Sequence, residues 1–120
     1  MPQPAVNNLF SGIPGKIPQE LSEILLESPG FYLERIISGG QATLPGQWYD
    51  QETHEWVVLL SGAAGLLFAG ETEVREMRPG DYVLIPAHCR HRVEWTDPEQ
   101  KTVWLALHFR ENAEKKQTVR

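Results

Sequence analysis

From residue 31 onward the chain is a series of short apolar runs, several of which alternate with polar residues in the period of a β-strand. Turns that contain glycine or proline separate these runs about every 8 to 12 residues, a spacing typical of an all-β sandwich or barrel. The predicted strands span residues 31–37, 54–61, 65–69, 71–76, 82–85, 91–95 and 102–109.

The residues before these strands follow a different pattern. Leu21, Ile24 and Leu25 are spaced as on one face of a helix, Pro18 suits a first helical turn, and a Ser-Pro-Gly stretch follows. We therefore expect one short helix over residues 17–27, preceded by an arm rich in proline and glycine. The expected organisation is an arm and helix packed on the barrel (1–30), the barrel (31–109) and a polar tail (110–120).

Composition limits the partners and the compartment. A length of 120 residues suits a single domain, and the net charge of −5 makes nucleic acid and anionic membranes poor candidates. The single cysteine, Cys89, has no internal disulfide partner, and no signal peptide is evident, so we expect a cytoplasmic protein. No apolar run approaches the roughly 18 residues of a membrane span.

The most informative stretch runs from residue 78 to 95. Gly80 follows a proline in a predicted type II turn, and Pro86 ends the short apolar strand that comes next. Beyond it His91, Val93 and Trp95 occupy alternate positions of a strand. This places a histidine among apolar neighbours on one face, and we take it as the main functional clue.

The spacing of Gly80, Pro86 and His91 resembles the second sequence motif of the small single-domain bacterial cupins, which are jelly-roll β-barrels. His88 stands where that motif has its second glycine, and Trp95 stands where it has asparagine. The resemblance covers about residues 31–109. It implies a cupin double-stranded β-helix and assigns His91 the place of the metal-binding histidine.

The first cupin motif is only half present. Glu55 and Gly62 have its spacing, but Trp48 and Asp50 stand where the family has its His-x-His pair. The string from Trp48 to Trp56 is similar to a subgroup of cupin-domain proteins without a settled activity.

The resemblance also makes the face of Glu55 the barrel interior, so that Glu55 points toward His91. Asp50, Glu55 and His91 would then bind a divalent metal ion (Mn²⁺, Fe²⁺, Zn²⁺ or Ni²⁺), with Glu55 or Asp50 moving protons. The alternative is a hydrogen-bonded pair of Glu55 and His91 without metal. Trp48 and Trp95 could wall a pocket for a small molecule.

Two other histidines are less defined. His54 is expected to face away from the interior, unless a bulge turns it inward in place of Asp50. His108 lies on the last predicted strand, where the register is open, and a structural role is expected for it.

Three classes of function follow: a metal-dependent isomerase, dioxygenase or lyase, a ligand-binding cupin without catalysis, or a partner-binding module. Edge strands and the apolar anchors of the arm favour a homodimer.

Overall fold

The computed structural model describes residues 3–111 of the chain, and these form β-strands joined by turns and loops. The strands are β1 (Leu21–Ser28), β2 (Phe31–Ser38), β3 (His54–Ser61), β4 (Ala64–Phe68), β5 (Arg75–Met77), β6 (Tyr82–Ile85), β7 (His91–Thr96) and β8 (Thr102–Phe109). Within this described part no helix is long and apolar enough to cross a membrane.

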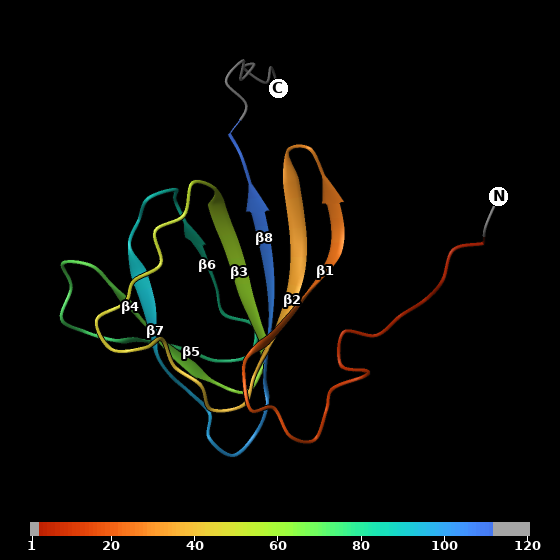
Figure 1. The fold of residues 1–120 in the computed structure, drawn as a ribbon, viewed down its shortest axis with the longest axis horizontal. Coiled ribbons are helices and arrows are strands. Elements are labelled where there is room, and N and C mark those ends of the chain that lie inside the picture. The colour runs from red at the N-terminus through yellow and green to blue at the C-terminus, as the bar shows by residue number, and fades with distance from the viewer. Residues whose placement is uncertain (1–2, 112–120) are drawn as a thin grey trace.

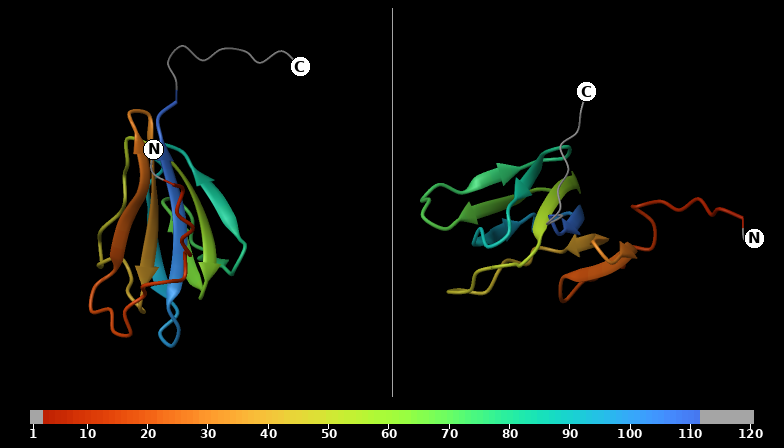
Figure 2. Two further views of the ribbon diagram at one scale, coloured as in Figure 1. Left: turned by 90° about the vertical axis from the view of Figure 1, so that its right-hand side faces the viewer. Right: turned by 90° about the horizontal axis from the view of Figure 1, so that it is seen from above.

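The strands form two antiparallel sheets (Figure 1). The larger sheet has the order β1-β2-β8-β3-β6, and the smaller has the order β5-β4-β7. Figure 2, seen from above, shows the two sheets as separate walls of the barrel. The core between them is apolar and includes Leu59 and Trp104 from the larger sheet and Leu66 and Met77 from the smaller. The predicted all-β jelly roll is confirmed.

The predicted N-terminal helix is wrong, because its residues form strand β1. Leu21 pairs with Ile37 and Ser28 with Phe31, so β1 and β2 make a hairpin. The register shifts between Ile24 and Leu26, which marks a β-bulge. Every residue of β1 is exposed, so the strand lacks the two-residue alternation by which it could be recognised in the sequence.

A glycine fixes the turn from β3 into β4. Gly62 has φ +83°, and a Cβ atom there would lie 2.6 Å from the Cα of Thr102. The hydroxyl of Thr102 donates to the carbonyl of Ala63 at 3.1 Å, so the start of β8 is tied directly to this turn. The glycine of the first cupin motif is therefore required by both conformation and space.

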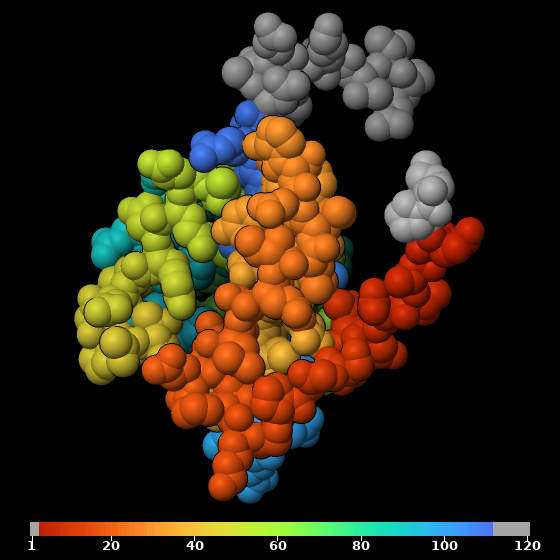
Figure 3. Space-filling view, turned by 45° about the vertical axis from the view of Figure 1, so that its right-hand side comes forward, coloured from red at the N-terminus to blue at the C-terminus, as the bar shows by residue number. Residues whose placement is uncertain are grey.

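The arm before β1 leads away from the barrel toward its first described residues (Figure 1, Figure 3). Its second half is tied down by hydrogen bonds from Arg35 to the carbonyls of Leu9 and Ser11, and by Ile17, which is buried. At the other end, the amide of Arg110 donates to the carbonyl of Gly30. The rest of the predicted polar tail, residues 112–120, lies outside the described residues.

Candidate functional site

A cavity of about 220 Å³ lies between the two sheets. Its apolar wall combines side chains from both sheets, and its polar groups are mainly carboxyl and imidazole groups. The lining residues are Glu20, Ser22, Glu34, Ile36, Tyr49, Gln51, Glu55, Val57, Leu66, Ile85, His91, Val93, Trp104 and His108.

Glu55 is placed in this cavity by the alternation of β3. Glu55, Val57 and Leu59 are buried while the residues between them are partly exposed, as the sequence predicts. In the sheet, Glu55 lies directly opposite His108 of β8 and Ile85 of β6. Residues opposite one another in adjacent strands point to the same face, so the register brings His108 to Glu55.

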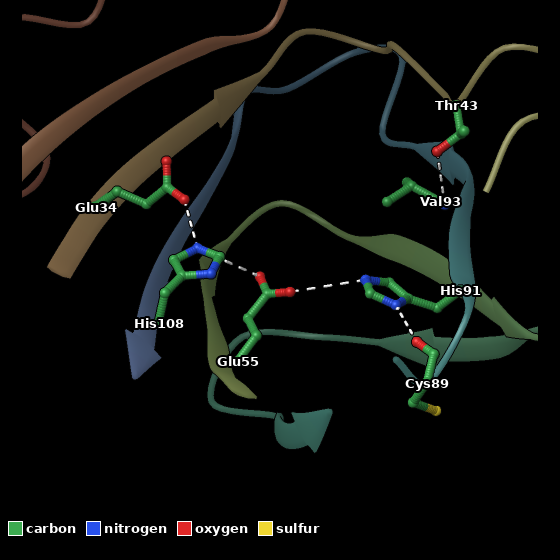
Figure 4. A network of polar contacts seen from close by, with 7 residues as sticks. All are labelled: Glu34, Thr43, Glu55, Cys89, His91, Val93 and His108. Carbon is green, nitrogen blue, oxygen red and sulfur yellow. Dashed lines mark hydrogen bonds and ion pairs between the residues drawn. The ribbon is translucent and has the colours of Figure 1, made fainter. Parts of the chain in front are cut away.

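Four side chains form a polar chain across the lumen (Figure 4). One oxygen of Glu55 lies 3.6 Å from Nε2 of His91, and the other lies 4.0 Å from Nε2 of His108. The same Nε2 of His108 lies 2.5 Å from Oε2 of Glu34. Glu55 thus sits between two imidazoles that come from opposite sheets.

The proton positions on His91 follow from its partners. Nδ1 of His91 lies 2.9 Å from the carbonyl oxygen of Cys89, which can only accept, so Nδ1 carries a hydrogen. Burial disfavours the charged form and lowers the pKa of His91. The contact with Glu55 and the hydrogen bond to Cys89 outweigh burial, so the pKa lies above its ordinary 6.5. These contacts therefore favour the protonated imidazolium form of His91, whose Nε2–H points at Glu55.

His108 is packed more tightly than His91. Its ring stacks on Tyr32 with centroids 4.4 Å apart, and its side chain is 3% exposed. Its Nδ1 is buried without a hydrogen-bond partner among the described residues. His108 therefore has a fixed orientation, with Nε2 directed at the two carboxylates.

Glu20 brings a third carboxyl group to the cavity. It accepts a hydrogen bond from the buried hydroxyl of Ser38 at 2.8 Å, and Ser38 in turn accepts one from Nε1 of Trp104. Burial and the nearby charges of Glu34 and Glu55 raise the pKa of Glu20, against the lowering effect of the Ser38 hydrogen bond. Burial is the largest of these causes, so Glu20 holds its proton more tightly than an exposed carboxyl group does.

The structure does not bring Asp50 to Glu55 and His91. Asp50 is half exposed, and its Oδ1 lies 2.8 Å from Nδ1 of His88, itself an exposed residue. Asp50 is absent from the described residues that line the cavity. His54 also faces outward, as expected: its Nδ1 accepts a hydrogen bond from the amide of Ala87.

The two tryptophans of the predicted pocket lie outside the lumen. Trp48 lies under the guanidinium groups of Arg90 and Arg92, at 5.5 and 5.8 Å from the ring centre. Trp95 is partly exposed and pairs with Gly65 beyond a register shift between β4 and β7. This bulge breaks the alternation, so Trp95 does not share the face of His91.

The lumen as it stands does not fit a three-ligand metal site. The described residues contain no group of three or more His, Cys, Asp and Glu side chains placed to hold a metal ion. Asp50 is engaged by His88 outside the cavity, and Nε2 of His108 is engaged by Glu34. Of the three predicted ligands, only Glu55 and His91 lie in the lumen, fewer than the three protein ligands of a typical catalytic site.

Sequence reasoning missed Glu20 and Glu34 as lumen residues, and it left open whether His108 faces the lumen. A local signal existed for Glu34 and His108. Glu34 lies two residues before Ile36 on β2, so the two share a face of the strand. His108 likewise shares a face of β8 with Trp104 and Ala106. A charged group on such a face must find a partner, but the pattern does not say which strand supplies it.

Comparison with known families agrees with this geometry. Residues 35–108 match the family model described as a cupin domain. The chain belongs to the cupin family. Glu55, His91 and His108 all fall within the matched residues, so the polar chain is part of the cupin domain itself. A comparison with curated proteins finds no match.

Solved structures show the same fold. A Ralstonia eutropha protein, provisionally named a mannose-6-phosphate isomerase, is 52% identical with a TM-score of 0.87, covering 90% of this chain and 100% of its own. A cupin superfamily protein of Desulfitobacterium hafniense has 20% identity and a TM-score of 0.73, covering 92% and 95%. The polyketide cyclase RemF of Streptomyces resistomycificus has 21% identity and a TM-score of 0.66, covering 78% and 67%. The last two support the fold alone.

Proposed function

We propose that this cupin binds a small polar molecule in its lumen and catalyses proton transfer on it, as an isomerase or lyase would. The observation that carries the proposal is the position of Glu55, 3.6 Å from one imidazole and 4.0 Å from another at the wall of the cavity. A carboxylate and an imidazolium that face each other give a base and an acid in the same site. The name of the 52% identical protein from Ralstonia eutropha supports an isomerase.

The roles follow from the protons assigned above. The Glu55 carboxylate takes a proton from a hydroxyl-bearing carbon next to a substrate carbonyl, while Nε2–H of His91 donates a proton to the carbonyl oxygen. This gives a neutral enediol. Glu55 then returns its proton to the former carbonyl carbon, and the hydroxyl on the other carbon gives its proton to His91 as it becomes the new carbonyl, so the isomerisation has no net change in protons.

His108 and Glu34 act as positioning residues in this scheme. The stacked, buried ring of His108 is held by Glu34 at 2.5 Å, so its Nε2 stays in one orientation 4.0 Å from the second oxygen of Glu55. The apolar wall, which includes Val57, Leu66 and Ile85, limits the water around the reacting groups.

The experiment follows deuterium incorporation from D₂O into a panel of hexoses, hexose phosphates and small keto acids, read by mass spectrometry. Proton abstraction is detected even when no net product forms. Exchange should fall by about a hundredfold or more in Glu55→Gln and His91→Gln. Matched controls, Glu71→Gln and His88→Asn, change the same residue types outside the lumen and should keep the exchange.

Two results would contradict the proposal. Exchange that survives in Glu55→Gln would show that another group is the base. Saturable binding without exchange for any compound would favour the alternative, a ligand-binding cupin without catalysis.

A bound divalent metal (Mn²⁺, Fe²⁺, Zn²⁺ or Ni²⁺) is the competing proposal for this lumen. Cupin domains often bind metals, and the hydrogen bond from Nδ1 of His91 to Cys89 orients Nε2 in the way typical of a ligating histidine. Elemental analysis of the untagged wild-type protein and of the His91→Ala and Asp50→Ala variants decides between a metal-bound lumen and a metal-free one. Near-stoichiometric metal in the wild type that is lost in His91→Ala would favour the metal proposal. Metal that is still bound in Asp50→Ala would agree with the outward position of Asp50.

A further inference from the structure

The lumen has an unbalanced set of charged groups. Glu20, Glu34 and Glu55 bring three carboxyl groups, and His91 and His108 bring two imidazoles. Lysine and arginine are absent from the described residues that line the cavity. Even with both imidazoles protonated, the ionised lumen carries a net negative charge.

The arginines of β2 and β7, two strands that line the lumen, are engaged elsewhere. Arg35 donates to carbonyls of the arm and pairs with Glu23 on the outer face. Arg92 donates to three carbonyls of the 43–47 loop and pairs with Glu94. These guanidinium groups would have to break existing contacts before they could reach a ligand in the lumen.

The carboxyl groups already interact unfavourably with one another. Burial raises the pKa of Glu20 most, and the charges of Glu34 and Glu55 add to this rise against the lowering hydrogen bond from Ser38. A phosphate group carries between one and two negative charges and is recognised in proteins by arginine, lysine or backbone N–H groups. Within the lining described above, no lysine or arginine performs this task, and the two imidazoles already face Glu55 and Glu34.

A cation would instead meet favourable partners. The carboxyl groups of Glu20 and Glu34 have oxygens that can accept from an ammonium group. The rings of Tyr49 and Trp104 also line the cavity, and aromatic faces attract cations. The cavity of about 220 Å³ lies below the usual range for drug-sized ligands, so the ligand is small.

We infer that the lumen selects a small molecule that carries a protonated amine, such as an amino sugar, and disfavours phosphate esters. The inference rests on the proposed function, since it names the substrate class of the same site. It differs from what the name of the Ralstonia eutropha protein suggests, because mannose 6-phosphate would bring its phosphate into a lumen lined by carboxyl groups.

The test compares two matched series of probes: mannosamine, mannose and mannose 6-phosphate, and ethanolamine, ethylene glycol and glycolate. Binding is measured by calorimetry and by the NMR signals of the His91 imidazole, which report entry into the lumen. The amine of each series should bind at least about tenfold more tightly than the neutral compound, and the anion more weakly than either.

A pair of variants separates the lumen charges from the net charge of the protein. Glu20→Gln should reduce the preference for amines severalfold. Glu71→Gln removes the same charge from an exposed residue that pairs with Arg75, so it should leave the preference unchanged. Equal effects of the two variants would overturn the inference.

The remaining outcomes distinguish the two proposals. Tightest binding of mannose 6-phosphate or glycolate, with a shift of the His91 signals, would overturn the charge preference and leave a lumen ligand site in place. If no probe of either series moves the His91 signals, the lumen is no ligand site, and the proposed function fails together with this inference.

Discussion

His91 is held by the carbonyl of Cys89 on one side and by the carboxylate of Glu55 on the other, and this determines how it titrates. The charged imidazolium gains more from these two acceptors than it loses by burial, so the pKa of His91 is raised in the folded protein. The folded state therefore binds this proton more tightly than the unfolded chain does.

The raised pKa predicts a pH-dependent stability. The contribution of His91 is complete below its ordinary pKa of 6.5 and is lost as the pH rises through the raised value. The difference in free energy of unfolding between wild type and His91→Gln should therefore shrink as the pH rises from about 6 to about 9. Urea titrations across this range measure it. In Glu55→Gln, NMR titration should show a lower pKa of His91 than in wild type, and an unchanged pKa would contradict the contact.

His88 gives a second prediction at the scale of one residue. It stands where the second cupin motif has glycine, and its φ is +62°, a left-handed conformation that costs a residue with a side chain about 1–2 kcal/mol. His88→Gly removes this strain and also removes the contact with Asp50. That contact is exposed to solvent, so its loss should cost little stability. We expect the His88→Gly variant to be as stable as wild type or about 1 kcal/mol more stable, and His88→Val to be less stable than both.

Thermal or urea unfolding of the three proteins measures this order. His88→Asn serves as a control, because asparagine tolerates the left-handed region better than valine does. A large loss of stability in His88→Gly would mean that the pair with Asp50 holds the rim of the barrel.

The turn from β3 to β4 permits a similar test at the scale of an element. Gly62 and Gly70 both have positive φ, +83° and +88°, but only at Gly62 would a Cβ atom meet other atoms within 4 Å. Gly70→Ala should cost about 1 kcal/mol through backbone strain alone, and Gly62→Ala about 3 kcal/mol or more because the added methyl group also displaces β8. Equal losses in denaturant unfolding would show that the contact with Thr102 is easily relieved.

Strand β1 shows how an element can be misread from a short pattern. Leu21, Ile24 and Leu25 have helical spacing, yet a helix of this length would gain little unless it buried that face. Pairing with β2 on both sides of the bulge after Ile24 supplies backbone hydrogen bonds instead. Tertiary pairing therefore outweighs local propensity here.

At the scale of the whole molecule, β1 is an edge strand with an apolar surface. Leu21, Ile24, Leu25 and Leu26 are between 40% and 57% exposed, and the arm beside them leads away from the barrel. Edge strands of this kind pair with another chain unless they are protected. A homodimer through β1 and the arm remains our prediction for the protein in solution, with a second copy as the partner.

Light scattering coupled to gel filtration measures the mass. Leu26→Lys should weaken the dimer by about tenfold or more. Leu84→Lys is the matched control, because Leu84 is similarly exposed, at 53%, on the opposite edge strand β6. A monomeric wild type, or a dimer that only Leu84→Lys dissociates, would contradict the prediction.

The sequence by itself determined the all-β barrel and two residues of the lumen. Glu55 and His91 could be found because each combines the motif spacing that resembles the cupins with an alternation within one strand, and both features lie in short stretches of the chain. The same holds for the turns at Gly62 and Gly80, where the backbone demands glycine.

Tertiary structure alone decided which groups meet in the lumen. His108 reaches Glu55 because β8 pairs with β3 in one particular register, and Glu34 reaches His108 because β2 pairs with the other edge of β8. Trp95 leaves the lumen face because of a bulge, and Asp50 leaves it because its loop pairs it with His88. Register and bulges join residues far apart in the chain, and a one-residue shift reverses the face of a side chain, so a pattern within one strand cannot fix them.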